Sequence, residues 1–325
     1  MSAIHDPRQG RTQGVRPHLG LLCLLWAPSA CGVTTVLARD PLEPGARRIG
    51  DLRYHPSPKD ADRRSLDLFL PAGPGPHPVV IFVHGGFWKK GGRREDYGIY
   101  QRLGRRLANQ GVIAAVISYR LVPQVRHPSQ ADDVARAVAT VRDNIAAYGG
   151  DPQQLYLMGH SAGAHLSLLV GWAPAYLAAH GLRPHDLAGI IAISGPTDLN
   201  DLATTWAGER NVPLAFGDDR DRWKVASPLT WVREGLPPTF LVLADDDFPV
   251  LRRENEGLRQ VLLGPKRPHR YRDVPSRDHA TIITRLWEDG DPLGEELLEW
   301  IKRRPSPAPP PRLRGSAPGG SSTSR

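Results

Sequence analysis

The chain has few cysteines, no apolar run long enough to cross a membrane and little net charge outside its ends. Only two of its 325 residues are cysteines, Cys23 and Cys31, which excludes a scaffold held together by disulfides. The apolar run 19–27 would rise only about 13 Å as a helix, far short of the roughly 30 Å hydrocarbon core of a bilayer. With 40% hydrophobic and 23% charged residues, the composition is that of an ordinary globular protein.

The formal net charge of +8 is concentrated at the two ends. Residues 1–38 carry +2 and residues 304–325 carry +4, which leaves only +2 for residues 39–303. Binding to a nucleic acid requires a cluster of lysines and arginines that neutralises phosphates. The nearly neutral body offers no such surface, so we expect no nucleic acid partner.

The ends differ from the body in composition. In residues 1–38 an arginine-bearing stretch, a short apolar run and small residues follow one another, as in an export signal. Two interpretations of the processing site stay open, namely lipidation of Cys31, which would anchor the protein to a membrane, and cleavage after Ala38. We expect an exported protein, or a cytoplasmic one if this segment is not a signal. Residues 304–325, rich in Pro, Ser, Gly and Arg, have almost nothing to bury and predict a disordered tail.

Residues 39–303 alternate between short apolar runs and longer helical patterns, and no linker divides them. Continuous apolar runs are typical of parallel strands covered on both faces. The run at 65–70 alternates instead, which suits an edge or antiparallel strand. We therefore predict one α/β domain with a mostly parallel central sheet and helices on both faces. The predicted strands are 65–70, 79–83, 112–118, 155–158, 189–194, 239–244 and 269–274, and the predicted helices are about 96–110, 129–147, 162–171, 251–262 and 293–303.

Ligand sites of open parallel sheets lie at the carboxyl ends of the strands. The strand 155–158 leads directly into Gly159-His160-Ser161-Ala162-Gly163, and a helix follows. This G-x-S-x-G pattern between a strand and a helix is a nucleophile elbow, in which small residues two positions either side allow a tight turn. Ser161 is thus the candidate nucleophile.

The strand 79–83 ends in His84-Gly85-Gly86-Phe87-Trp88. Glycines let the main chain approach a substrate oxygen closely, so Gly85 and Gly86 are candidate oxyanion donors, together with the N–H group of Ala162. We expect His84 to support this loop by hydrogen bonding. For Phe87 and Trp88 two interpretations stay open, since the rings either line a substrate pocket or pack inside the protein.

The chain order serine, acid, histidine that accompanies this elbow limits the candidates for the base. Only His269 and His279 follow the acidic cluster 245–247. His279 comes after the last predicted strand, in a loop that can reach over the elbow, and we predict that it is the base. His160 and His165 lie near Ser161 in the sequence, and we expect them to pack and to form supporting hydrogen bonds.

The candidate acid lies directly after the strand 239–244, in Asp245-Asp246-Asp247. Three adjacent carboxylates repel one another, so we expect only one of them to turn inward. Asp247 is our choice, and Asp246 is the alternative. Asp198, after the strand 189–194, ranks third, and Asp278 is too close to His279 in the chain to contact its ring easily.

These motifs together resemble the α/β-hydrolase fold, in the branch of carboxylesterases, kynurenine formamidases and prenylcysteine methylesterases. The resemblance covers about residues 65–303 and rests on HGGFW, SYRLVPQ at 118–124, the elbow string at 148–166 and DHATII at 278–283. It differs at the acid, where many relatives have a glycine and this chain reads ADDDFP.

The resemblance implies a serine hydrolase that needs no cofactor and no metal ion. Its triad would be Ser161, Asp247 and His279, and its substrate a small or short-acyl ester, because little or no cap precedes the first predicted strand. A kynurenine formamidase-type amide hydrolase is the alternative within this fold. A non-catalytic binding protein that kept the fold is the alternative of another class.

Overall fold

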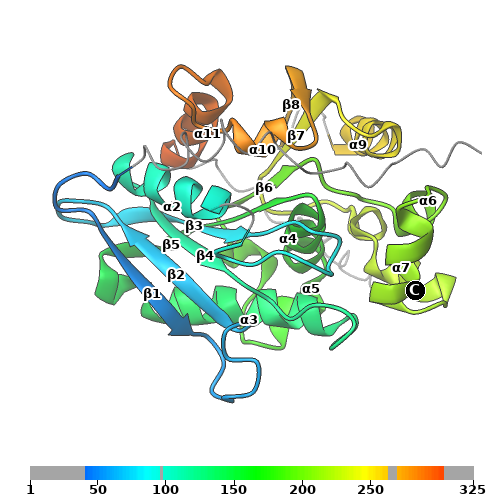
Figure 1. Ribbon diagram of the computed structural model, residues 1–325, viewed down its shortest axis with the longest axis horizontal. Helices are drawn as coiled ribbons and strands as arrows, with labels where there is room; N and C mark the ends of the chain where they lie inside the picture. Colours follow the sequence, from blue (N-terminus) through cyan, green and yellow to red (C-terminus); the bar gives the residue numbers. More distant parts are fainter. Residues whose placement is uncertain (1–40, 96–97, 263–268, 304–325) are drawn as a thin grey trace, which may run out of the picture.

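The computed structural model describes residues 41–95, 98–262 and 269–303, and the predicted leader and tail lie outside these ranges. Its centre is one eight-stranded sheet with the strand order β1-β2-β4-β3-β5-β6-β7-β8 (Figure 1). Strand β2 runs antiparallel to β1 and β4, and all other neighbours are parallel. The strands are β1 (Arg47–Arg53), β2 (Ser65–Leu70), β3 (His77–Val83), β4 (Ile113–Ile117), β5 (Gly150–His160), β6 (Gly189–Ile193), β7 (Thr239–Asp246) and β8 (Arg270–Asp278).

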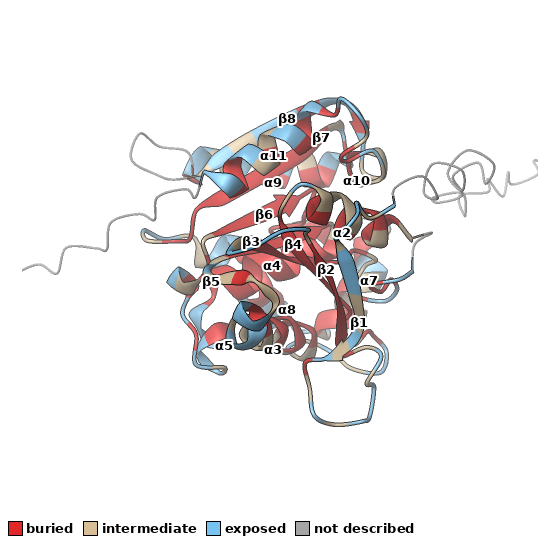
Figure 2. Ribbon diagram, turned by 90° about the vertical axis from the view of Figure 1, so that its left-hand side faces the viewer, coloured by how far each residue is buried: buried red, intermediate tan, exposed pale blue. Residues whose placement is uncertain are grey.

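Helices cover both faces of the sheet, and each face has its own apolar core. In β3, Val79, Ile81 and Val83 belong to one core and Val80 and Phe82 to the other, because successive side chains of a strand point to opposite faces. Figure 2 shows the central strands as buried between these layers. The α-helices are α2 (Ile99–Asn109), α3 (Ser129–Asn144), α4 (Ala162–Trp172), α5 (Pro174–Ala178), α6 (Leu199–Leu202), α7 (Gly208–Phe216), α8 (Arg220–Ala226), α9 (Pro249–Leu262), α10 (Thr281–Thr284) and α11 (Pro292–Lys302).

The cores assign the larger helices to their faces. Apolar side chains of α3, α4 and α9 belong to the first core, whereas those of α2 and α11 belong to the second. None of the helices in the described ranges is both long enough and apolar enough to span a membrane. The α/β architecture predicted from the sequence is confirmed.

All seven predicted strands are present, and β2 is antiparallel as its alternation indicated. It is not at the edge, since β1 pairs with it from outside. Its one charged residue, Asp67, is fully buried and accepts hydrogen bonds from Arg48, Arg93 and Arg94. Burial raises the pKa of Asp67, but the guanidinium groups of Arg94 and Arg48 outweigh it and hold the pKa far below its usual range. The polar residue in the alternating pattern of β2 is therefore a buried charge paired with arginines, and not a side chain that faces solvent.

A short helical insertion follows β6 and was not predicted. It comprises α6, α7, α8 and the 3₁₀ helix η4 (Pro228–Trp231). The side chains of Asp198 and Asp219 begin two of these helices by accepting the N–H groups of Asn200 and Asp221. Among the described residues, β1 rather than a helical cap precedes β2.

Candidate active site

Ser161 lies on the turn between β5 and α4, in a backbone conformation that few side chains adopt. Its φ is 56° and its ψ is −123°, which is strained for a residue with a Cβ. The turn is possible because glycines stand two residues before and two residues after Ser161. A Cβ on Gly159 would lie 2.3 Å from the Gly163 oxygen, and one on Gly163 would lie 2.1 Å from the Val83 oxygen. The G-x-S-x-G spacing is therefore a steric requirement of this turn.

His279 comes directly after β8 and reaches the serine across the sheet edge. Its Nε2 lies 3.0 Å from Ser161 Oγ, and its Nδ1 lies 2.9 Å from Asp247 Oδ1. A carboxylate only accepts hydrogen bonds, so Nδ1 carries the proton and Nε2 presents its lone pair to the serine hydroxyl. The structure thus brings the three predicted residues together in one chain of hydrogen bonds.

Asp247 is the one of the three consecutive aspartates that turns inward. Its side chain has no exposed surface, and Phe248 N–H also donates to its Oδ1. Burial alone would raise the pKa of Asp247, but the hydrogen bond and charge of His279 and the Ser194 hydroxyl lower it below its usual range. The carboxyl group is therefore ionised at neutral pH.

The other candidate acids have different partners. Asp246 is exposed, and Asp198 caps α6. Asp278 accepts the N–H groups of Ala280 and Thr281 and so shapes the turn that carries His279. Of the acids that the sequence left open, only Asp247 contacts the imidazole among the described residues.

The loop after β3 places two glycines beside the elbow. A Cβ on Gly85 would lie 3.2 Å from Ser161 Cβ, and one on Gly86, where φ is 108°, would lie 2.2 Å from the Lys90 oxygen. The Gly85 N–H donates to the Tyr100 hydroxyl at 3.3 Å. The N–H group of Ala162, the first residue of α4, has no acceptor within its helix. The Gly85 N–H therefore already has an acceptor within the protein, which leaves the N–H groups of Gly86 and Ala162 as the candidate donors to a substrate oxygen.

The two aromatic residues of this loop, Phe87 and Trp88, differ in how far they are buried. Trp88 is only 1% exposed and packs edge-on against His165 and Phe216, so of the two interpretations packing applies to it. Phe87 is half-buried with φ at 53°. Phe248, which was not predicted from the sequence, is 39% exposed, and the centre of its ring lies 4.8 Å from that of the His279 imidazole.

Two other histidines near the elbow support the fold, as predicted. The His84 Nδ1 lies 2.7 Å from the Gly85 oxygen, and its ring stacks on Tyr119 at 4.2 Å. The His165 Nε2 lies 2.9 Å from the Ala226 oxygen. Burial lowers the pKa of His84 to about 4 and that of His165 to about 3, so both rings are neutral.

Glu254 of α9 holds the loop that follows β6. Its Oε2 accepts the N–H groups of Thr197 and Asp198, while its Oε1 is buried without a hydrogen-bond partner among the described residues. Burial and, to a smaller extent, the nearby charges of Asp201 and Asp198 together raise the pKa of Glu254 to about 8 despite these two donors. The carboxyl group is therefore largely protonated near neutral pH.

This raised pKa predicts a stability that falls as the pH rises. Below the unfolded pKa of about 4.3, Glu254 is protonated in both the folded and the unfolded state and does not lower the free energy of unfolding. Between that pH and about 8, only the unfolded chain releases the proton freely, so the free energy of unfolding decreases. In Glu254→Gln this component is absent, and the melting temperature of the variant relative to wild type should increase from pH 5 to pH 8. A difference that stays constant over this range would contradict the prediction.

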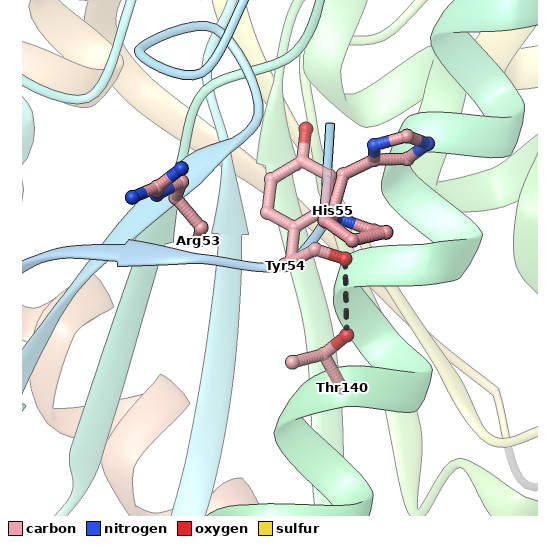
Figure 3. A pocket seen from close by; sticks show the side chains of 5 residues that line it. Arg53, Tyr54, His55 and Thr140 are labelled. Carbon is pink, nitrogen blue, oxygen red and sulfur yellow. Dashed lines mark hydrogen bonds between the residues drawn. The ribbon is translucent and has the colours of Figure 1, made fainter. Parts of the chain in front are cut away.

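A surface hollow elsewhere on the molecule shares no residue with this site. It measures about 340 Å³ and is lined by Arg53, Tyr54, His55, Pro56 and Thr140, at the end of β1 against α3 (Figure 3). The Thr140 hydroxyl there donates to the Tyr54 carbonyl oxygen at 3.4 Å. Within the described ranges, no group of three or more His, Cys, Asp or Glu side chains is arranged to hold a metal ion.

The sheet order, the strained turn at the carboxyl end of β5 and the histidine after the last strand are those of an α/β-hydrolase. The chain belongs to the BD-FAE family, whose model matches residues 66–262.

The chain is also similar to named relatives in sequence and to solved structures in fold. A rice (Oryza sativa) protein named "Probable isoprenylcysteine alpha-carbonyl methylesterase" is 31% identical over 62% of this chain and 50% of its own length. The kynurenine formamidase of Danio rerio is 27% identical over 74% of this chain and 79% of its own length. The structure of esterase B from Lactobacillus rhamnosis has a TM-score of 0.69 at 20% identity, over 84% of this chain and 91% of its own. The chain thus spans about half the length of the rice relative.

Proposed function

We propose that the protein is a serine esterase that hydrolyses carboxylic esters of small or short-acyl substrates through an acyl-enzyme. One observation carries this proposal, namely the hydrogen-bonded chain from Asp247 through His279 to Ser161. The name of the rice relative supports an ester as the substrate. The absence of a helical cap before β2 among the described residues supports a small one.

The reaction follows from the placement of the protons. His279 Nε2 accepts the proton of Ser161 as Oγ attacks the ester carbonyl, and Asp247 stabilises the imidazolium that forms. The N–H groups of Gly86 and Ala162 bind the developing oxyanion, and each such donor contributes about 2.7–4 kcal/mol to the transition state. The imidazolium then protonates the leaving alcohol. Water, deprotonated by His279, releases the acid and restores the serine.

A formamidase activity is the second candidate, and the similarity to the zebrafish kynurenine formamidase favours it. The same triad would attack a formamide carbonyl, and the imidazolium would protonate the leaving amine. The two functions differ in the acyl group and the leaving group rather than in the catalytic residues.

The experiment is a substrate panel on the purified full chain. Nitrophenyl esters with acyl chains of increasing length are compared with N-formylkynurenine and with acetylated sugars. We expect the highest kcat/KM for a short nitrophenyl ester and a decrease with acyl length, together with covalent labelling by a fluorophosphonate probe. A kcat/KM for N-formylkynurenine above that of every ester would favour the formamidase. An unlabelled protein without turnover would overturn both.

A further inference from the structure

His160, the residue before Ser161, contacts the main chain of the candidate base. It is the last residue of β5 and only 4% exposed. Its Nε2 lies 2.9 Å from the main-chain oxygen of His279, and the two rings are 4.9 Å apart. A carbonyl oxygen only accepts, so Nε2 of His160 must carry the proton of this hydrogen bond. Burial and the nearby His279 lower the pKa of His160 to about 3, so the ring is neutral.

The opposite side of the same ring faces the loop after β3 that carries Gly85 and Gly86. A Cβ on Gly85 would lie 3.3 Å from His160 Nδ1 and 3.1 Å from its main-chain oxygen. Nδ1 itself is buried without a hydrogen-bond partner among the described residues. The ring therefore fills the space between the loop of Gly85 and the loop of His279.

Packing alone does not account for a histidine at this position. A buried nitrogen without a partner costs free energy, and an apolar side chain of similar size would fill the space without that cost. What the histidine adds is the Nε2–H group, the donor to the His279 carbonyl. On the other side of His279, Asp278 binds the N–H groups of Ala280 and Thr281. The main chain is thus held on both sides of the imidazole.

We propose that His160 is a positioning residue for the proposed ester hydrolysis, holding the His279 main chain so that the imidazole stays within reach of Ser161. This inference rests on the proposed function. Without the Nε2–H donor, the His279 carbonyl would be free to turn and the distance from His279 Nε2 to Ser161 Oγ, now 3.0 Å, would lengthen. A displacement of about 1 Å in a catalytic group costs on the order of 100-fold in rate.

The test compares two amides of different reach. In His160→Gln the side-chain amide can take the place of Nε2 and still donate to the His279 carbonyl. In His160→Asn the amide ends near the place of Nδ1 and is too short to donate. His160→Leu fills the space without any donor. The kcat and KM for a short nitrophenyl ester are measured for each variant, with the folded fraction counted by fluorophosphonate titration.

We expect His160→Asn and His160→Leu to lose about 10- to 100-fold in kcat with little change in KM, and to react with the probe more slowly in the same proportion. His160→Gln should recover most of the loss, whatever the melting temperatures of the three variants. Equal kcat in the Gln and Asn variants, or an unchanged kcat in both Asn and Leu variants, would overturn the inference alone. A wild-type protein that neither reacts with the probe nor cleaves an ester would overturn the proposed function and the inference with it.

Discussion

Replacing Ser161 by alanine should lower kcat for a short nitrophenyl ester by about 10⁶-fold, and His279→Ala should lower it by a similar factor. The serine hydroxyl is a weak nucleophile unless its proton is accepted, and the only imidazole nitrogen that contacts it among the described residues is His279 Nε2. Because the two side chains act as one unit, the double variant should be hardly slower than either single variant.

The residual rate of these variants is informative as well. The backbone donors that we propose, Gly86 and Ala162, remain in place in these variants, so some acceleration over the uncatalysed reaction should persist, on the order of 10³-fold. A matched control is Ser167→Ala. Ser167 lies on the same helix, α4, and its hydroxyl donates to the Gly163 oxygen. Its kcat should stay within a few-fold of wild type. A kcat of Ser161→Ala close to wild type, in protein free of host esterases, would contradict the assignment of the nucleophile.

Most of the fold follows from the sequence because buried parallel strands are continuous apolar runs. The strand β1 could not be predicted in this way, because its sequence RRIGDLR is polar and mostly exposed. It forms a strand by pairing with β2. Such tertiary support overrides local preference. The helices α6, α7 and α8 were missed for a similar reason, because they pack against one another, and α6 and α8 are short and begin at capping side chains.

The candidate site was predictable wherever a motif has a steric cause. The elbow at Ser161 needs glycines around it, and the chain order of the triad reduced twelve histidines to two. The contact between His160 and His279 joins residues 119 positions apart, and no local pattern records it. The hydrogen bond from Gly85 N–H to Tyr100 is equally invisible in the sequence.

From the sequence we chose Asp247 as the acid, but Asp246 stayed open as the alternative because three adjacent aspartates have the same chemistry. In the structure the three aspartates differ in their position relative to β7, which ends at Asp246. Successive side chains of a strand alternate between its faces, and Asp246 is exposed whereas Asp247, just beyond the strand, is buried against the imidazole. The position of a strand end, uncertain by a residue or two in any sequence reading, therefore decides which carboxyl group is in the site.

Asp247→Asn should lower kcat for the same ester by about 10⁴-fold, whereas Asp246→Asn should leave it within a few-fold of wild type. An asparagine fills the same space, but it has no charge to stabilise the imidazolium, and its amide can favour the other tautomer of His279, in which Nε2 carries the proton and cannot accept one from Ser161. The neighbouring Asp246→Asn removes the same charge from an exposed position. Measuring kcat for both variants, with melting temperatures as a check on folding, separates the loss of the hydrogen bond to Nδ1 from a general loss of negative charge around the site. If Asp246→Asn were the slower of the two, the acid of this triad would be Asp246, and the hydrogen bond between Asp247 and His279 would not be the one that supports catalysis.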